Sequence, residues 1–403
     1  MLKYWLWLAE LPGLNNQARL ALLRHFGSPE DIFYAEEAEL SLVEDLSEAQ
    51  RAAVLEDHNL GPANYILADC QRLGQRILTI QDAEYPKRLY NIYDPPCLLY
   101  VRGRLPAFDE EAAIAVVGTR KCTPYGIACA EKLGYGVAAC GGLVVTGLAK
   151  GIDSAAARGA LRAGGRVVGV TGNGLDVPYP YESRHLYEDV AAAGVLISEY
   201  PPGTEPDGHH FPVRNRIMSG LSVAALVVEA PARSGALITA HLALDQGREV
   251  FAVPGPIDAP ASAGCIRLMQ EGAYPVADAW DILGQYEGRF PDKLRPAGPA
   301  PEHRGAPVRR VSSQPTPKAP APEKTPEPAP ALPLRNMEGL TDDQITLLQT
   351  LEPEKPAQVD ELIQATEIPA RRVLSALTML EIDGLVRQHS GKSYTRTVTL
   401  RGR

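Results

Sequence analysis

Six mainly apolar runs without polar alternation, separated by stretches with helical spacing, dominate the middle of the chain. The runs are residues 113–118, 142–147, 166–172, 194–199, 223–230 and 249–255. A run without polar alternation indicates a strand that is buried on both faces, as in a parallel sheet covered by helices on both sides. The pattern therefore predicts an α/β domain over residues 81–290, with a Rossmann-like, doubly wound and mainly parallel sheet.

The first 80 residues have apolar positions at helical spacing, interrupted by turns at 12–14 and 26–31. Ser28 before Pro29 is typical of a helix start. The segment 1–80 is therefore predicted to be a small helical domain, similar to SAM-like or helix-hairpin-helix units that contact DNA backbones or protein partners. A plain packing role is the alternative.

A proline-rich segment separates this core from the C-terminal part. Residues 291–335 hold 13 of the 35 prolines, and we expect a flexible linker there. The segment 336–403 then reads as three helices followed by a hairpin, with Thr341 capping the first helix, Pro369 in the first turn of the third and Gly384 ending it. This order predicts a winged helix-turn-helix domain.

Composition and charge narrow the class of protein. The chain has 403 residues, of which 45% are hydrophobic and 22% charged, so general disorder and a fibrous architecture are excluded. The net charge of −9 divides into −6 over residues 1–102, −5 over 103–290, +4 over 291–335 and −2 over 336–403. This sum argues against a protein that binds DNA through a broadly basic surface, but it leaves room for a local basic site.

The cysteines and the N-terminus indicate the compartment. The six cysteines contain no CxxC pair and several lie in apolar runs, which is typical of reduced thiols in a cytoplasmic protein. The first residues resemble no secretory signal, and no run approaches the ~18 apolar residues of a membrane span. We therefore expect a cytoplasmic protein without a membrane span.

Glycine-rich loops follow several of the predicted strands, where ligands bind in open parallel sheets. Gly118 and Thr119 lead to Arg120, and backbone N–H groups beside a guanidinium form a phosphate cradle. A surface ion pair is the alternative for Arg120. In the next loop, Gly147 precedes Lys150, an anion contact, and Asp153, which is expected to cap a helix.

Two further loops carry polar and aromatic side chains. Asn173 and Gly174 follow a strand, and the nearby Tyr179 and Tyr181 could stack on a base or simply cover the loop. Ser234 and Gly235 open a helix after the strand that ends near Glu229, so their N–H groups are expected to point at the same crevice.

The segment HHFPVRNRIMSGLS combines cations with an amide. Arg214, Asn215 and Arg216 stand at the start of an apolar helix, which is typical of an anion and base-edge reader. The adjacent His209 and His210 lack a carboxylate or cysteine at metal spacing, so no metal site is predicted. Neither a GxGxxG fingerprint nor a Walker A motif occurs, and no cofactor is expected.

The loops occur in an order that resembles the DNA-processing protein A family (DprA, also called Smf). The resemblance covers residues 80–275 and rests on YPKRLYNIYDPPCLLYVRG, AVVGTR, GLAKGID, GNGLDVPYP, ISEYPPG, FPVRNRIMSGLS, VVEAPARSGALITA and GREVFAVPG. It implies a Rossmann-like core that binds single-stranded DNA, forms a homodimer and helps load RecA recombinase in natural transformation, without catalysis. Single-stranded DNA-binding protein is a further candidate partner.

By position, Arg120 matches the arginine that lines the DNA pocket of the family, and the motifs around it carry the other candidates. The predicted DNA-binding residues are Gly118, Thr119, Arg120, Gly147, Lys150, Asn173, Gly174, Arg184, Arg214, Asn215, Arg216, Ser234 and Gly235. A second candidate DNA site in the winged helix comprises Arg371, Arg372, Arg387, Lys392 and Arg396.

The chain departs from the family pattern at three positions. Ala157 stands where a histidine is usual, Tyr181 where a basic residue is common, and Ile266 where an asparagine is usual. These departures put single contacts in question, and Arg184 is the cation nearest to Tyr181 in the sequence.

Two other functions are kept as alternatives. One is a nucleotide-processing enzyme of the lysine-decarboxylase-like phosphoribohydrolase type, with Glu199 or Glu229 in the catalytic role, although its PGGxGT motif is missing. The other is a scaffold that binds DNA mainly through the winged helix.

Overall fold

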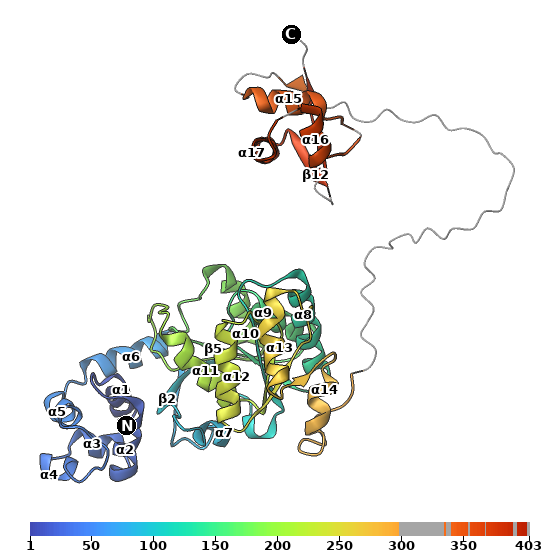
Figure 1. Cartoon of the computed structure of the whole chain (residues 1–403). Coiled ribbons are helices and arrows are strands. Elements are labelled where there is room, and N and C mark those ends of the chain that lie inside the picture. The colour runs from blue at the N-terminus through green and yellow to red at the C-terminus, as the bar shows by residue number, and fades with distance from the viewer. Residues whose placement is uncertain (298–333, 336–339, 354, 367, 390–392, 401–403) are drawn as a thin grey trace. The chain divides into compact units, whose positions relative to one another are not determined.

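The structure is a computed structural model that describes residues 1–297, 334–335, 340–353, 355–366, 368–389 and 393–400. The chain divides into two compact units, residues 1–305 and 306–403, and each is described by itself (Figure 1). Among the described residues, no helix combines the length and the apolarity needed to cross a membrane.

A nine-stranded sheet forms the centre of the first unit, in the order β1-β2-β6-β5-β4-β3-β7-β8-β9. Its strands are β1 (Arg76–Thr79), β2 (Leu98–Gly103), β3 (Ala113–Val117), β4 (Leu143–Thr146), β5 (Val167–Thr171), β6 (Val195–Ser198), β7 (Ala224–Val227), β8 (Glu249–Ala252) and β9 (Tyr274–Pro275). Strands β3 to β9 pair in parallel, whereas β2 is antiparallel to β6 and β1 to β2. The predicted mainly parallel sheet is thus confirmed, and the sequence analysis missed its antiparallel edge.

Helices cover both faces of the sheet (Figure 1). The helices of this part are α7 (Lys87–Tyr90), α8 (Pro124–Ala139), α9 (Ile152–Arg162), α10 (Arg184–Ala193), α11 (His210–Gly220), α12 (Gly235–Asp245), α13 (Ala263–Gln270) and α14 (Trp280–Leu283). Along β3, Ile114 and Val116 belong to the hydrophobic cluster of α8, α9 and α10, whereas Ala115 and Val117 belong to that of α11, α12 and α13. Both faces of the strand are buried, which explains its unbroken apolar run.

The order of the strands creates a crevice at one end of the sheet. From β3 the chain adds β4, β5 and β6 on one side and then returns to add β7 and β8 on the other, so that Ile114 of β3 pairs with Val144 and with Ala224. In open parallel sheets such a switch leaves a ligand-binding crevice outside the carboxyl ends of the two diverging strands. The loops after β3 and β7 lie at this point.

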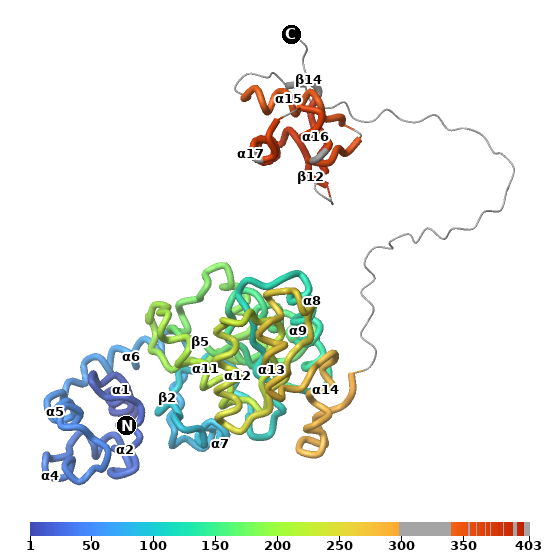
Figure 2. The backbone as a smooth tube through the Cα atoms, viewed as in Figure 1, coloured from blue at the N-terminus to red at the C-terminus, as the bar shows by residue number. Residues whose placement is uncertain are grey.

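The N-terminal segment is helical and lies beside the sheet (Figure 2). Its helices are α1 (Leu2–Glu10), α2 (Asn16–Phe26), α3 (Pro29–Phe33), α4 (Glu37–Leu40), α5 (Glu48–Glu56) and α6 (Gly61–Arg72). Ser28 caps α3 through the N–H of Asp31, as predicted. Trp5 and Leu8 belong to the same hydrophobic cluster as Tyr100 of β2, so the segment shares its core with the sheet.

The second unit has its own small core. Helices α15 (Asp342–Thr350), α16 (Val359–Thr366) and α17 (Ala370–Ile382) are followed by the hairpin of β12 (Val386–His389) and β13 (Ser393–Arg396), to which β11 (Ala357–Gln358) adds a third strand. Two further strands, β10 (Leu334–Arg335) and β14 (Thr399–Leu400), pair in parallel. Thr341 caps α15 in a capping box, as predicted, and the three helices with a hairpin confirm the winged-helix prediction.

Candidate functional site

A cleft of about 520 Å³ lies outside the carboxyl ends of β3 and β7, where the strand order reverses. We call it the strand-end cleft. Its walls come from the loop after β3, the start of α9, the first turns of α11 and the start of α12. It brings together seven of the predicted residues, namely Gly118, Thr119, Arg120, Arg214, Asn215, Ser234 and Gly235.

One wall of the strand-end cleft is a stack of a cation and two aromatic rings. The Arg120 guanidinium lies 5.0 Å from the centroid of the Phe211 ring, and Phe211 in turn stacks on Tyr179 with centroids 5.5 Å apart and an interplanar angle of 26°. Both rings line the cleft. The sequence analysis considered Tyr179 but missed Phe211, whose signal was an aromatic residue three positions before Arg214.

Arg214 lies in the floor of the cleft and is almost fully buried, with 4% exposure. Its Nη1 donates to the carbonyl of Val170, while its Nε finds no hydrogen-bond partner among the described residues. Burial lowers the pKa of Arg214. Because Arg214 lines the cleft, its guanidinium gives the floor a positive charge, which favours an anion.

Asp153 is the acidic residue in this floor. Its carboxylate accepts the N–H of Gly147 at 3.1 Å and does not cap helix α9, contrary to the expectation from the sequence. Burial raises the pKa of Asp153 to about 6, against the opposing effect of Arg214. The position of Gly147 has no room for a larger side chain, because a Cβ there would lie 2.4 Å from the Arg214 guanidinium.

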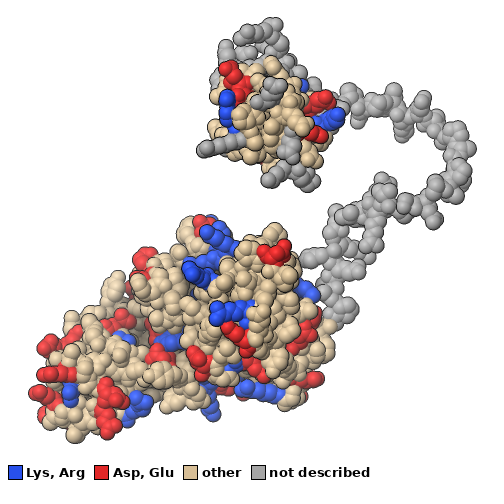
Figure 3. Space-filling view, in the orientation of Figure 1, with Lys and Arg blue, Asp and Glu red and all other residues tan. Residues whose placement is uncertain are grey.

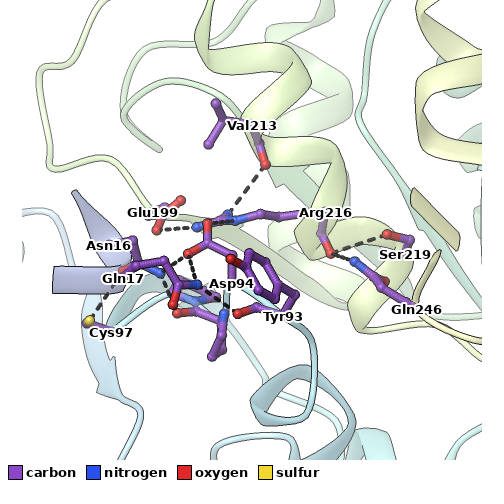
Figure 4. A network of polar contacts seen from close by, with 12 residues as sticks. Asn16, Gln17, Tyr93, Asp94, Cys97, Glu199, Val213, Arg216, Ser219 and Gln246 are labelled. Carbon is purple, nitrogen blue, oxygen red and sulfur yellow. Dashed lines mark hydrogen bonds and ion pairs between the residues drawn. The ribbon is translucent and has the colours of Figure 1, made fainter. Parts of the chain in front are cut away.

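Arg216 does not line the strand-end cleft, and its side chain points toward Glu199 and Asp94 (Figure 4). Its Nε donates to Asp94 at 2.9 Å and its Nη2 to Glu199 at 2.7 Å. Burial alone would lower the pKa of Arg216, but Glu199 and Asp94 together raise it above its ordinary value. Its guanidinium therefore serves a buried ion-pair network, whereas the sequence analysis placed it with the ligand.

The same network reaches the N-terminal helices. Asp94 accepts from Asn16 at 2.8 Å and from Gln17 at 3.1 Å, both in α2, while Gln246 donates to the Arg216 carbonyl at 3.2 Å (Figure 4). Helix α11 is thus fixed from both sides behind the cleft.

Asn173 and Gly174 hold their own loop together. The Asn173 side chain is buried and donates to the carbonyls of Gly174 and Val177, at 3.1 and 2.5 Å. The N–H of Gly174 donates to the carbonyl of Thr204 at 2.9 Å. The structure does not bring either residue into the strand-end cleft.

Lys150 and Arg184 are exposed and do not line the cleft. Lys150 lies in a neighbouring groove that shares Arg120 with the cleft. The Arg184 guanidinium lies 4.9 Å from the ring centroid of Tyr181, so these two side chains form a cation–π pair.

The two glutamates considered for catalysis are engaged elsewhere. Glu199 pairs with Arg216. Glu229 accepts the N–H and hydroxyl of Thr123 at 2.8 and 2.6 Å, which anchors the start of α8. Neither residue lines the strand-end cleft.

The candidate DNA-binding residues of the second unit differ in how far their side chains are free to bind DNA. Arg372 pairs with Asp343 at 2.8 Å, and Arg396 donates to the carbonyl of Leu348 at 3.0 Å. Arg387 is exposed on β12. Arg371 belongs to α17 but its side chain lies outside the described residues, as does the whole of Lys392.

Two of the three departures from the family pattern lie on helices. Ala157 is fully buried in α9, so the usual histidine would face the protein interior there. Ile266 is half-buried in α13.

Comparison with known proteins places both units. A family model described as DNA recombination-mediator protein A matches residues 76–287, and one described as DprA winged helix domain matches residues 315–392. The protein Smf of a Synechocystis strain is 34% identical over 399 residues, 98% of each chain. The DNA processing protein DprA of Bacillus subtilis is 41% identical over 224 residues, which cover 56% of this chain and 75% of the relative. The X-ray structure of DNA processing protein A from Streptococcus pneumoniae aligns at a TM-score of 0.56 and 36% identity, over 71% of this chain and 98% of the other.

Proposed function

Because the chain belongs to the DNA recombination-mediator protein A (DprA) family, we propose that it binds single-stranded DNA in the strand-end cleft and helps load RecA recombinase onto that strand in natural transformation and recombination. In this proposal the protein acts without catalysis and without a cofactor. Its relatives are named for DNA processing, which supports DNA as the ligand.

The observation that carries the proposal is the stack of Arg120, Phe211 and Tyr179 beside the buried Arg214. Single-stranded nucleic acids are held by cations that contact phosphates and by aromatic rings on which unpaired bases stack. The strand-end cleft offers both within about 520 Å³. The guanidinium of Arg214, which lines the cleft, adds a positive charge for a phosphate.

Charge supports a preference for single strands. The bases of a duplex are stacked on each other and cannot enter a cleft to stack on protein rings. The net charge of −9 also disfavours contact with a long duplex surface. A strand would instead be captured where a few arginines and backbone N–H groups converge.

Partners follow from the same proposal. We propose a homodimer through the core, for which Leu244, exposed on α12 and outside the cleft, offers apolar surface. RecA is the proposed recipient of the strand, and single-stranded DNA-binding protein a further partner. The domains are proposed as 1–80, 81–290, the linker 291–335 and 336–403, and the compartment as the cytoplasm, in keeping with six free thiols.

An enzyme of the phosphoribohydrolase type has less support. It needs a carboxylate in the crevice, and the two glutamates considered for this role, Glu199 and Glu229, are held by Arg216 and Thr123 outside it. The carboxylate that does line the cleft, Asp153, accepts the N–H of Gly147. Release of free base from a panel of nucleoside monophosphates would restore this alternative.

The experiment that tests the proposal compares single-stranded and duplex DNA binding by the full chain and by a chain without residues 336–403, at two salt concentrations. The hydrophobic clusters of the first unit contain no residue of the second, so deleting residues 336–403 leaves the core of the first unit packed. We expect the shortened protein to keep its affinity for single strands and its preference over duplex. Loss of that affinity would make the winged helix the main DNA-binding part and contradict the proposal.

A further inference from the structure

A second groove, of about 650 Å³, adjoins the strand-end cleft. Its walls are the first turns of α8 and α9 and the segment 180–183 before α10, so we call it the α8–α9 groove. Arg120 lines both the cleft and the groove. The two hollows therefore meet at this one side chain.

The α8–α9 groove gathers exposed cations. Besides Arg120 it is lined by Lys121, Lys150 and Arg158, and in the described part of the chain none of these four has a carboxylate within ion-pair distance. All four side chains are exposed. Unpaired cations lining a hollow make it a site for an anion.

The α8–α9 groove is lined by fewer acidic than basic residues. Glu131 and Glu182 line it, and Glu131 is already paired with Arg162 at 2.9 Å. The local excess of positive charge contrasts with the net −5 over residues 103–290. In the space-filling view, acidic side chains gather on the N-terminal helices at the left, while several basic ones gather on the upper part of the core (Figure 3).

We propose that the single strand held in the strand-end cleft continues past Arg120 into the α8–α9 groove, where Lys121, Lys150 and Arg158 bind its phosphates. This proposal rests on the proposed function, since the cleft supplies the strand. The two parts differ in chemistry. The cleft carries the rings of Phe211 and Tyr179 for bases, whereas no aromatic residue in the described part of the chain lines the groove. Contacts in the groove are therefore to the DNA backbone and independent of sequence.

The proposal predicts that affinity depends on strand length. An oligonucleotide that fills only the cleft does not reach the groove, whereas a longer one gains the phosphate contacts of both. Each phosphate contact to a single strand contributes about 0.7 to the slope of affinity against salt. The groove is therefore visible as an added salt dependence in longer strands.

The test uses the full chain with the double substitution Lys150→Ala and Arg158→Ala, both at exposed positions. The matched control is Arg24→Ala with Arg104→Ala, which removes the same charge from exposed residues outside both hollows. Fluorescence anisotropy measures binding of oligo-dT of about 4 and about 16 nucleotides over a salt series. We expect the groove variant to bind the longer strand about 10-fold more weakly, with a salt slope reduced by about 1.4, and to bind the shorter strand like wild type.

The remaining outcomes separate this proposal from the proposed function. Wild-type affinity of the groove variant for both strands overturns the groove proposal and leaves the cleft untouched. Equal weakening for both lengths also overturns it, because Lys150 and Arg158 would then act on the strand in the cleft. If the groove variant loses only binding of an acidic peptide such as oligo-Glu, the groove takes a protein and not DNA. If wild type binds neither oligonucleotide, the proposed function itself fails.

Discussion

Arg214 and Arg216 lie two residues apart on helix α11, yet their guanidinium groups serve opposite sides of it. Arg214 lines the strand-end cleft, while Arg216 lies in the network of Asp94 and Glu199. Two steps along an α-helix turn a side chain by about 200°, so neighbouring arginines of one motif necessarily diverge. Their substitutions are expected to affect different properties.

Arg216→Ala is expected to lower the stability of the first unit. It leaves the carboxylates of Asp94 and Glu199 without their cation in a site that is largely buried. Removing one partner of a buried pair costs about 3–5 kcal/mol, and the partial exposure of both acids favours the lower end. Urea denaturation measures the change. A loss below about 0.5 kcal/mol would show that the network is as weak as a surface ion pair.

Phe211→Ala is expected to weaken single-stranded DNA binding by about 1–3 kcal/mol, because a base loses its stacking partner. Phe211→Trp keeps a flat ring and should retain most of the affinity. Tyr181→Ala is the control, since Tyr181 does not line the cleft. If the alanine variants at 211 and 181 bind alike, the stack is not a base platform.

Gly147→Ala is expected to impair binding without removing any polar group. A Cβ at this position would lie 2.4 Å from the Arg214 guanidinium, so the arginine must move away from the carbonyl of Val170 and out of its place in the cleft floor. The measurement is the affinity for a short oligo-dT. Gly288→Ala is the control, since a Cβ there meets no atom within 4 Å and the residue lies outside the cleft. Unchanged binding by the Gly147 variant would mean that Arg214 does not hold the strand.

Stability should depend on pH through Asp153. Its pKa in the folded protein is about 6, above the ordinary 3.8, so the folded state holds the proton more tightly than the unfolded one. The resulting stability is fully present below pH 3.8 and is lost as the pH rises through 6, by about 3 kcal/mol in all. Urea midpoints of wild type and Asp153→Asn across this range measure it. We expect the Asn variant to lack this part of the slope, and parallel curves would contradict the assignment.

The central strands could be predicted from the sequence because each is apolar on both faces. An apolar run of this kind is visible in the sequence without knowing which strands lie beside it. The edge strands β1 and β2 were missed because their residues, such as those at 76–79, lie outside the repeated pattern of strand, glycine loop and helix. The two-residue β11 is too short to leave any period.

The site was predicted in part for a similar reason. Gly118, Arg120 and Ser234 lie in the segments that follow β3 and β7, so the topology of a parallel sheet brings them to one crevice. The role of Arg216 depends on Asp94, 122 positions away in the sequence, which no local pattern reveals. Asn173 has a polar side chain in a glycine loop, but its hydrogen bonds to the carbonyls one and four residues further along depend on the exact path of the backbone.

The central claim is that the strand-end cleft holds single-stranded DNA through Arg120. The most direct test is the affinity of Arg120→Ala for labelled single-stranded DNA, beside Arg104→Ala as a control of equal charge outside the cleft. We predict that Arg120→Ala binds at least about 10-fold more weakly at moderate salt and that the control binds like wild type. Equal affinity of Arg120→Ala and wild type would contradict the account.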